Sequence, residues 1–309
     1  MKIWLAITSV TKKLKWLLLV AMVVASYFDF PHYDWFGRAF MFLFLIQPGA
    51  IQGFFQLPGS VVAWIRRGFR LPSKKNYKCK GDYILPFTGK WTVLNGGVDR
   101  KISHSWILVS QRYAYDFIII DDEGKRLDGD GKLVQSFFCH GQDIVAPADG
   151  VVVALSNKHK DSRVDSGKKI YCDAWDIRGN YITIKHHDRE YTCTAHILQN
   201  SFTVKVGDRV KQGQVIAKCG NSGNTTEPHI HFQLQTGKSF LLSAGLPIEF
   251  NNIKAEESMG YVKVHEILKV KLRTLDGNLQ SAHDGKTYIG RGLNVENGIA
   301  ESHAGSVYD

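Results

Sequence analysis

Two histidines separated by a single residue stand out in the segment "EPHIHFQL", residues 227–234. Successive side chains of a β-strand point to opposite faces, so a strand here places His229 and His231 on one face. Imidazole nitrogens bind zinc, and a hydrolytic zinc site needs about three histidine or carboxylate ligands and one open position for water. The spacing is therefore compatible with a zinc site, although a half-buried strand with two surface histidines has the same pattern.

Two further residues are of a suitable type. Asp116 lies in the strongly β-prone run "YDFIII", residues 115–120, where a carboxylate is otherwise costly to bury. His196 ends the strand-like segment "REYTCTAHI", residues 189–197. Taken alone, each is more typical of a surface or core polar group than of a ligand.

The order of these segments resembles the lysostaphin and LytM-type zinc metallopeptidases, which cut peptide cross-links in bacterial cell walls. An aspartate on an early strand is followed by four segments in the family's order. These are "APADGVVVAL" at 146–155, "GNYITIKHHDREYTCTAHI" at 179–197, "VKVGDRVKQGQVIAKCGNSGN" at 204–224 and finally "EPHIHFQL". The resemblance covers about residues 85–250.

The resemblance implies a role for each matching residue. The family binds Zn²⁺ through a His and an Asp of a His-x-x-x-Asp motif and through the second His of His-x-His, which matches Asp116 and His231 here. Its two remaining histidines assist catalysis, and they match His196 and His229. Peptidoglycan peptides are the implied substrate.

The first metal-ligand motif departs from the family, because Arg112 stands four residues before Asp116. Arginine has no lone pair to offer a metal. The nearest upstream histidine is His104, and we predict that a loop or hairpin brings it beside Asp116 as the third ligand. His140 is a weaker candidate, because it follows the aspartate. Arg112 is expected either to orient a carboxylate from the same strand face or to form a surface ion pair.

These residues must be positioned by β-structure. From Tyr83 onward, short β-branched or alternating runs are separated by Gly, Asn and Asp turn signals. The fold class predicted is mainly β, an antiparallel β-sandwich or open barrel-like peptidase domain over residues 83–250. Residues 251–309 are expected to form a C-terminal extension whose role the sequence does not indicate.

The first 70 residues differ in character and predict a hydrophobic membrane segment. Three lysines precede the apolar run of residues 16–28, which is typical of a signal peptide or signal anchor. A second apolar region, residues 39–65, is broken by Gln, Pro and Gly, which favours a kinked, re-entrant or interfacial segment, although a second span is an alternative. A basic linker, residues 71–82, follows. Seven cations and no acid occupy residues 65–80, a pattern that suits a membrane-flanking segment.

Composition narrows the class of function. The formal net charge is +10, which favours an anionic surface, but no aromatic-basic signature of nucleic-acid binding accompanies it. The five cysteines form no CxxC pair, which argues against a cysteine-based zinc finger.

Two functions remain open. One is a zinc metalloendopeptidase at the bacterial inner membrane, its catalytic domain facing the periplasm or cell exterior because peptidoglycan lies there. The other is an inactive domain of the same fold that binds cell wall or regulates a partner hydrolase. The cations after residue 65 oppose the exported orientation, because positive charge favours the cytoplasmic side.

Overall fold

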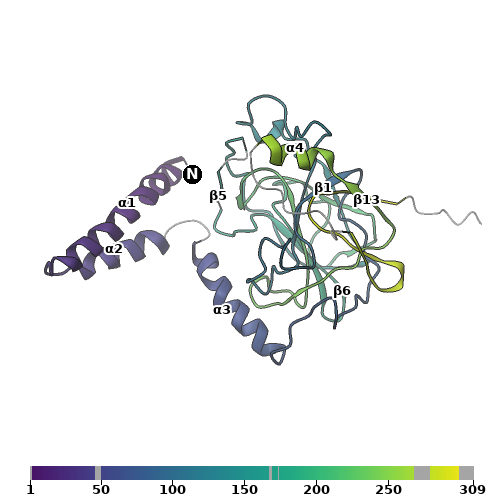
Figure 1. Ribbon diagram of the computed structural model, residues 1–309, viewed down its shortest axis with the longest axis horizontal. Helices are drawn as coiled ribbons and strands as arrows, with labels where there is room; N and C mark the ends of the chain where they lie inside the picture. The colour runs from purple at the N-terminus through teal and green to yellow at the C-terminus, as the bar shows by residue number, and fades with distance from the viewer. Residues whose placement is uncertain (1, 46–49, 167–168, 173, 268–278, 299–309) are drawn as a thin grey trace, which may run out of the picture.

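A computed structural model describes residues 2–45, 50–166, 169–172, 174–267 and 279–298. The chain begins with three helices and continues into a body built mainly from antiparallel strands (Figure 1). The helices are α1 (Lys2–Tyr27), α2 (Asp34–Leu45), α3 (Ala50–Arg66) and, late in the chain, α4 (Met259–Ile267). The mainly β, antiparallel class predicted for the peptidase domain is confirmed.

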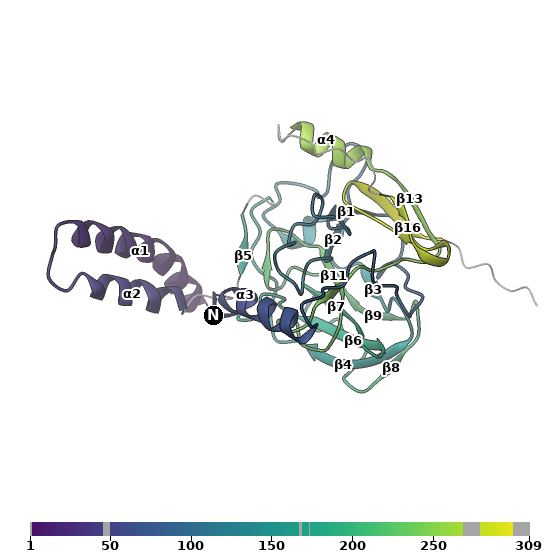
Figure 2. The same ribbon diagram turned by 60° about the horizontal axis from the view of Figure 1, so that its bottom comes forward.

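One sheet dominates the body and runs in the order β13-β16-β1-β2-β11-β7-β6-β4-β8, with β12 paired to β11 (Figure 2). Its neighbouring strands are all antiparallel. The strands are β1 (Trp91–Asn95), β2 (Tyr115–Ile118), β4 (Gly150–Ser156), β6 (Tyr181–His187), β7 (Glu190–Ala195), β8 (Arg209–Val210), β11 (Ile230–Gln235), β12 (Gly245–Leu246), β13 (Ile253–Glu257) and β16 (Leu293–Asn297).

Among the described residues, three two-stranded pairs lie outside this sheet. They are β3 (Asp143–Val145) with β9 (Val215–Lys218), β5 (Tyr171–Cys172) with β10 (Asn224–Thr225), and β14 (Gln280–Ser281) with β15 (Thr287–Tyr288). Two short 3₁₀ turns lie at Val134–Ser136 and His283–Gly285.

The core lies where the sheet meets β3, β9 and the segment before β1. Aromatic side chains fill it, with Phe87 stacked on Trp91 and Tyr115 stacked on Phe117. Burial of such large rings is the main favourable term in folding a β-domain of this kind. The central strands are therefore held rigidly, which fixes the side chains on their other face.

The C-terminal residues are part of the main sheet. β16 pairs with β1, with Trp91 opposite Val295, and β13 pairs with β16 along its whole length. Leu293 and Val295 belong to the same buried core as Trp91. Described residues of the segment after 250 thus complete the sheet next to the strand that precedes Asp116.

The N-terminal helices lie to one side of the β-body. In both views α1 and α2 run side by side and extend away from it, while α3 lies along its surface (Figures 1 and 2). Within the described residues, no helix combines the length and the apolar character that crossing a membrane requires. The hydrophobic membrane segment expected in residues 1–70 is therefore not supported by the helices.

Candidate metal and catalytic site

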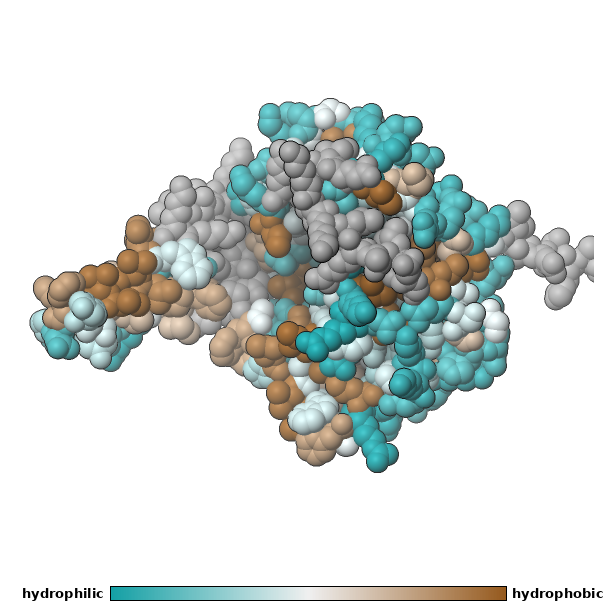
Figure 3. Space-filling model, in the orientation of Figure 1, coloured by the Kyte–Doolittle hydropathy of each residue, from teal (hydrophilic) through white to brown (hydrophobic). Residues whose placement is uncertain are grey.

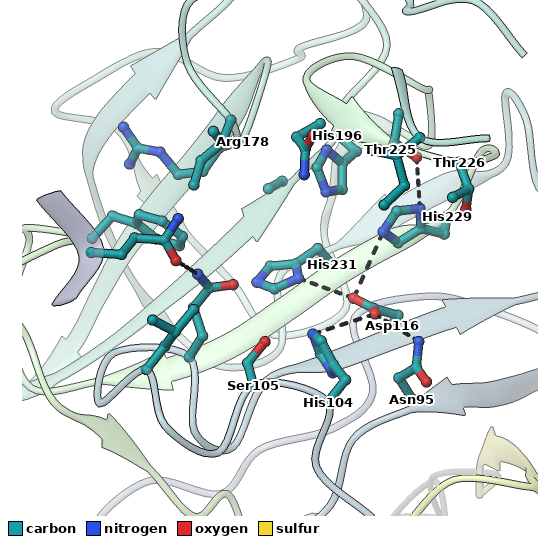
Figure 4. A pocket seen from close by; sticks show the side chains of 18 residues that line it. Asn95, His104, Ser105, Asp116, Arg178, His196, Thr225, Thr226, His229 and His231 are labelled. Atoms are coloured by element: carbon teal, nitrogen blue, oxygen red, sulfur yellow. Dashed lines mark hydrogen bonds and ion pairs between the residues drawn. The ribbon is translucent and has the colours of Figure 1, made fainter. Parts of the chain in front are cut away.

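Three neighbouring strands, β2, β11 and β7, bring the predicted residues together. Asp116 on β2 lies directly opposite His231 on β11, and His231 in turn lies opposite Ala195 at the end of β7. His196 is the next residue after β7, and His229 immediately precedes β11. The antiparallel register therefore places residues far apart in sequence at one point of the sheet (Figure 4).

The candidate metal cluster consists of His104, Asp116 and His231. One ligand atom from each lies within 4.8 Å of the other two. His231 Nδ1 is 3.0 Å from Asp116 Oδ1, and His104 Nε2 is 3.6 Å from Asp116 Oδ2. These separations suit donors that share one ion, because Zn²⁺ binds histidine nitrogen and carboxylate oxygen at about 2.0–2.2 Å.

His104 lies in the loop between β1 and β2, and this loop brings it beside Asp116. Ser103 Oγ donates a hydrogen bond to the carbonyl oxygen of Arg112, at 2.7 Å, and so ties the residue before His104 to the part of the loop that leads into β2. The His104 side chain keeps 27% exposure, whereas that of His231 keeps 8%. The cluster therefore has one side open to solvent.

Arg112 does not share a strand face with Asp116 and forms no ion pair with another described residue. β2 begins at Tyr115, so Arg112 precedes the strand and does not share its face. Its guanidinium lies 5.0 Å from the ring of Trp106, and its Nε donates to the Trp106 carbonyl oxygen. The arginine that stands where the family has a metal ligand thus stabilises the loop that carries His104.

Hydrogen bonds fix which nitrogen each buried histidine presents. His196 Nδ1 donates to the Ser222 carbonyl oxygen at 2.7 Å, and His229 Nδ1 donates to the Glu227 carbonyl oxygen at 2.8 Å. A carbonyl oxygen only accepts, so in the neutral rings the lone pair is at Nε2. In His229 that atom faces Asp116 Oδ1 at 3.7 Å.

His231 has the opposite tautomer. Its Nε2 lies 3.1 Å from the Gln233 Oε1 atom, while the Gln233 amide nitrogen donates to the Ser110 carbonyl oxygen and to Gln235 Oε1. This arrangement makes Gln233 Oε1 the acceptor and His231 Nε2–H the donor. The lone pair of Nδ1 then faces the Asp116 carboxylate with no proton between them, an arrangement that a shared cation would stabilise. The donor set therefore fits a zinc ion.

The charge states follow from burial and from the neighbours. Burial lowers the pKa of His104 and holds the pKa of His196 well below its usual value, so both rings are neutral at pH 7. Burial by itself would raise the pKa of Asp116, but the neighbouring histidines His104, His229 and His231 outweigh it and hold that pKa well below the usual value. The site thus offers a carboxylate at Asp116 and neutral imidazoles at His104 and His196.

A cavity of about 410 Å³ opens over these residues. All five predicted residues line it, and so do Asn95, Arg178, Thr225 and, from helix α3, Gln56. Asn95 donates to Asp116 Oδ2 at 3.2 Å. His140 does not line the cavity and instead contacts Asp161, with 2.8 Å between His140 Nε2 and Asp161 Oδ2.

Sequence reasoning missed Gln233 and Gln56. The alternation of side chains along a strand could have identified Gln233, because it follows His229 and His231 on the same face in the pattern His-x-His-x-Gln. Gln56 carried no comparable signal, because it lies in a separate helix that contacts the cavity only in the folded chain.

Comparisons with known proteins relate part of the chain to a peptidase family. Residues 133–241 match Peptidase family M23. The predicted resemblance to lysostaphin and LytM-type peptidases is thereby confirmed over this part of the chain. The matched range includes His196, His229 and His231, whereas His104 and Asp116 precede it, in the region where the sequence departs from the family's first motif.

Individual relatives match over short stretches. The glycyl-glycine endopeptidase ALE-1 of Staphylococcus capitis is 41% identical over 64 residues, which are 21% of this chain and 15% of that protein. The peptidoglycan DD-endopeptidase ShyC of Vibrio cholerae is 42% identical over 57 residues, 18% of this chain and 13% of that protein. Among solved structures, the catalytic domain of lysostaphin from Staphylococcus simulans is 23% identical, covers 56% of this chain and 90% of that one, and has a TM-score of 0.28.

Proposed function

We propose that this protein is a zinc-dependent metalloendopeptidase that hydrolyses peptide cross-links of bacterial peptidoglycan. The observation that carries the proposal is the convergence of His104, Asp116 and His231 within 4.8 Å of one another. The names of the relatives, a glycyl-glycine endopeptidase and a peptidoglycan DD-endopeptidase, support the substrate class. In this proposal His104, Asp116 and His231 hold the metal, and His196 and His229 act in catalysis.

In this proposal the metal-binding residues and the two remaining histidines have different roles in hydrolysis. Bound zinc would act as a Lewis acid that polarises the scissile carbonyl and makes a water nucleophilic near pH 7. His229 and His196 each bond a carbonyl oxygen through Nδ1 and leave Nε2 to the cavity, so either ring in its neutral form accepts the proton released as water attacks. The ring that becomes cationic then stabilises the developing oxyanion and protonates the leaving amine. The ring centroids of these two histidines are 4.5 Å apart, so both reach one substrate bond.

We further propose that the N-terminal region associates with the bacterial cytoplasmic membrane and that the peptidase domain faces the periplasm or cell exterior. A peptidoglycan substrate requires this side. A fusion of a periplasm-active reporter after residue 309 tests the orientation. Reporter activity only in the cytoplasm would exclude the cell-wall substrate.

The second candidate is an inactive domain that binds cell wall or regulates a partner hydrolase. Arg112 at the family's ligand position favours it, because loss of a ligand commonly accompanies loss of activity in enzyme folds. The proximity of His104 to Asp116 favours the enzyme instead.

Incubation of the full chain with isolated peptidoglycan, followed by chromatography of the released fragments, separates the two candidates. The wild type is expected to release cleaved cross-links. The substitution His196→Ala is expected to keep zinc and lower turnover by roughly 100-fold or more, because a general acid–base contributes about that much. His231→Ala is expected to lose the zinc as well. Zinc-loaded wild type that binds peptidoglycan without cleaving it would support the inactive domain, and equal zinc loss in both variants would contradict the division of roles.

A further inference from the structure

Helix α3 packs on the β-body with its polar side. Gln52 Oε1 accepts a hydrogen bond from the Ile177 backbone N–H at 2.7 Å, Ser60 Oγ accepts one from the Val109 N–H at 3.0 Å, and Gln56 Oε1 accepts one from the Gln111 side chain at 2.8 Å. The three residues recur at intervals of four, so they form one stripe along the helix.

The helix also lies unusually close to the body along this stripe. A Cβ atom at Gly59 would be 2.5 Å from the Leu241 carbonyl oxygen, so only glycine permits the approach. Gly59, Ser60 and Ala63 are buried there. Small and polar residues therefore form the inner face of α3.

The outer face of α3 is apolar and exposed, which reverses the usual arrangement of an amphipathic helix on a soluble domain. In the space-filling view, hydrophobic side chains gather along this lower edge of the molecule and on the α1–α2 hairpin (Figure 3). The exposed large apolar residues of α3 are Phe54, Phe55, Leu57, Val61, Trp64 and Ile65, with exposures of 42–57%.

Cations follow this apolar face directly. Arg66, Arg70 and Lys75 are exposed, and residues 65–80 contain seven cations without an acidic residue. Trp64 packs edge-to-face against Phe69, at 4.7 Å between ring centroids, beside these arginines. Apolar side chains with an aromatic pair and neighbouring cations complement the acyl boundary and the anionic headgroups of a lipid surface.

We propose that α3 is an interfacial helix whose outer face lies in the surface of an anionic lipid bilayer, while its inner face forms part of the wall of the active-site cavity. Gln56 links the two, because it lines the cavity together with Gln111 and belongs to the polar stripe. The cavity is then held close to the membrane surface. This lipid contact does not depend on peptide hydrolysis, so either property can fail without the other.

Hydrogen–deuterium exchange of the full chain tests the contact peptide by peptide, which separates α3 from α1 and α2. The probes are vesicles of phosphatidylcholine alone and vesicles that also contain phosphatidylglycerol. Peptides from residues 53–66 are expected to exchange more slowly with the anionic vesicles than with the neutral ones. The double variant Phe54→Ser/Leu57→Ser is expected to need roughly ten-fold more lipid, or above, for the same protection. The reason is that it loses the apolar surface which these two side chains would bury in the bilayer.

The matched control is Met259→Ser/Leu133→Ser, which removes two apolar side chains with exposures of 57% and 67% outside α3. It is expected to keep the protection. Circular dichroism and zinc content verify that both variants are folded. Unchanged exchange of residues 53–66 on vesicle-bound protein would overturn the proposal. Protection that appears without lipid and grows with protein concentration would also overturn it, because a second copy of the chain would then cover the face.

Discussion

At the residue scale, Gln233 decides which nitrogen of His231 faces the proposed metal. Its Oε1 atom accepts the His231 Nε2–H, and its own amide is held by the Ser110 carbonyl oxygen and Gln235. Both glutamine side chains are buried, so neither is free to turn toward solvent. A buried amide chain of this kind fixes a ligand more firmly than a single hydrogen bond does.

The substitution Gln233→Leu is therefore expected to lower zinc affinity by about 10–100-fold, the effect typical of losing the hydrogen-bond partner of a metal-binding histidine. Competition with a chromophoric chelator measures the affinity. Gln235→Leu is the matched control, because it leaves the contact between Gln233 and His231 in place and is expected to cost less. An unchanged affinity in Gln233→Leu would show that His231 needs no such partner.

At the scale of elements, the register of β2, β11 and β7 assembles the site, and β6 supports β7 from the next position in the sheet. His186 on β6 connects three segments of this region. Its Nδ1 donates to the Asp149 carbonyl oxygen, and its Nε2 lies 2.8 Å from Thr192 Oγ1 on β7. Burial lowers the pKa of His186 to about 4.

This pKa predicts a pH-dependent stability. The folded chain holds His186 neutral, whereas the unfolded chain binds a proton below about pH 6.5, so protonation favours unfolding. The contribution of neutral His186 to the free energy of unfolding is fully present above about pH 6.5, and it is lost as the pH falls toward about 4. Between about pH 7.5 and pH 4.5 the wild type is expected to lose roughly 2 kcal/mol more unfolding free energy than His186→Gln does.

Urea unfolding at both pH values measures this difference. His187→Gln, at the exposed neighbouring position, is the control and is expected to follow the wild type. Parallel pH profiles for the wild type and His186→Gln would contradict the assignment of this stability to His186.

At the scale of the whole molecule, the chain's late residues stabilise the strand that leads into the site. β16 covers the edge of β1, and Leu293 is buried with 3% exposure in the main core. Without β16, β1 would present an unpaired edge beside β2 and Asp116. We therefore expect β16 to unfold together with the rest of the sheet.

Leu293→Ala is expected to lower the free energy of unfolding by about 2–5 kcal/mol, because it removes buried methyl groups and leaves a cavity. Lys254→Ala on the neighbouring strand β13 removes an exposed ion pair with Glu296 and is expected to stay within about 0.5 kcal/mol of the wild type. Equal stabilities of the two variants, measured by urea titration, would show that β16 is not part of the cooperative unit.

Local pattern was enough to predict the strands around Asp116, His196 and His231, because alternation and turn residues act over a few positions. The resemblance to a known family then related these strands to one site. The surroundings of Arg112, the pairing of β16 with β1 and the polar inner face of α3 depend on contacts between distant segments. No single stretch of sequence encodes those contacts, so the sequence alone did not predict them.

The central claim is that His104, in place of the family's usual ligand, completes a zinc site with Asp116 and His231. The most direct measurement is the zinc content of the purified full chain, compared with His104→Ala, Asp116→Ala and the control His140→Ala, whose side chain pairs with Asp161 outside the cavity. The account predicts about one zinc per chain in the wild type and in His140→Ala, and loss of zinc in the other two variants. A wild type without zinc, or zinc retained in His104→Ala, would contradict it.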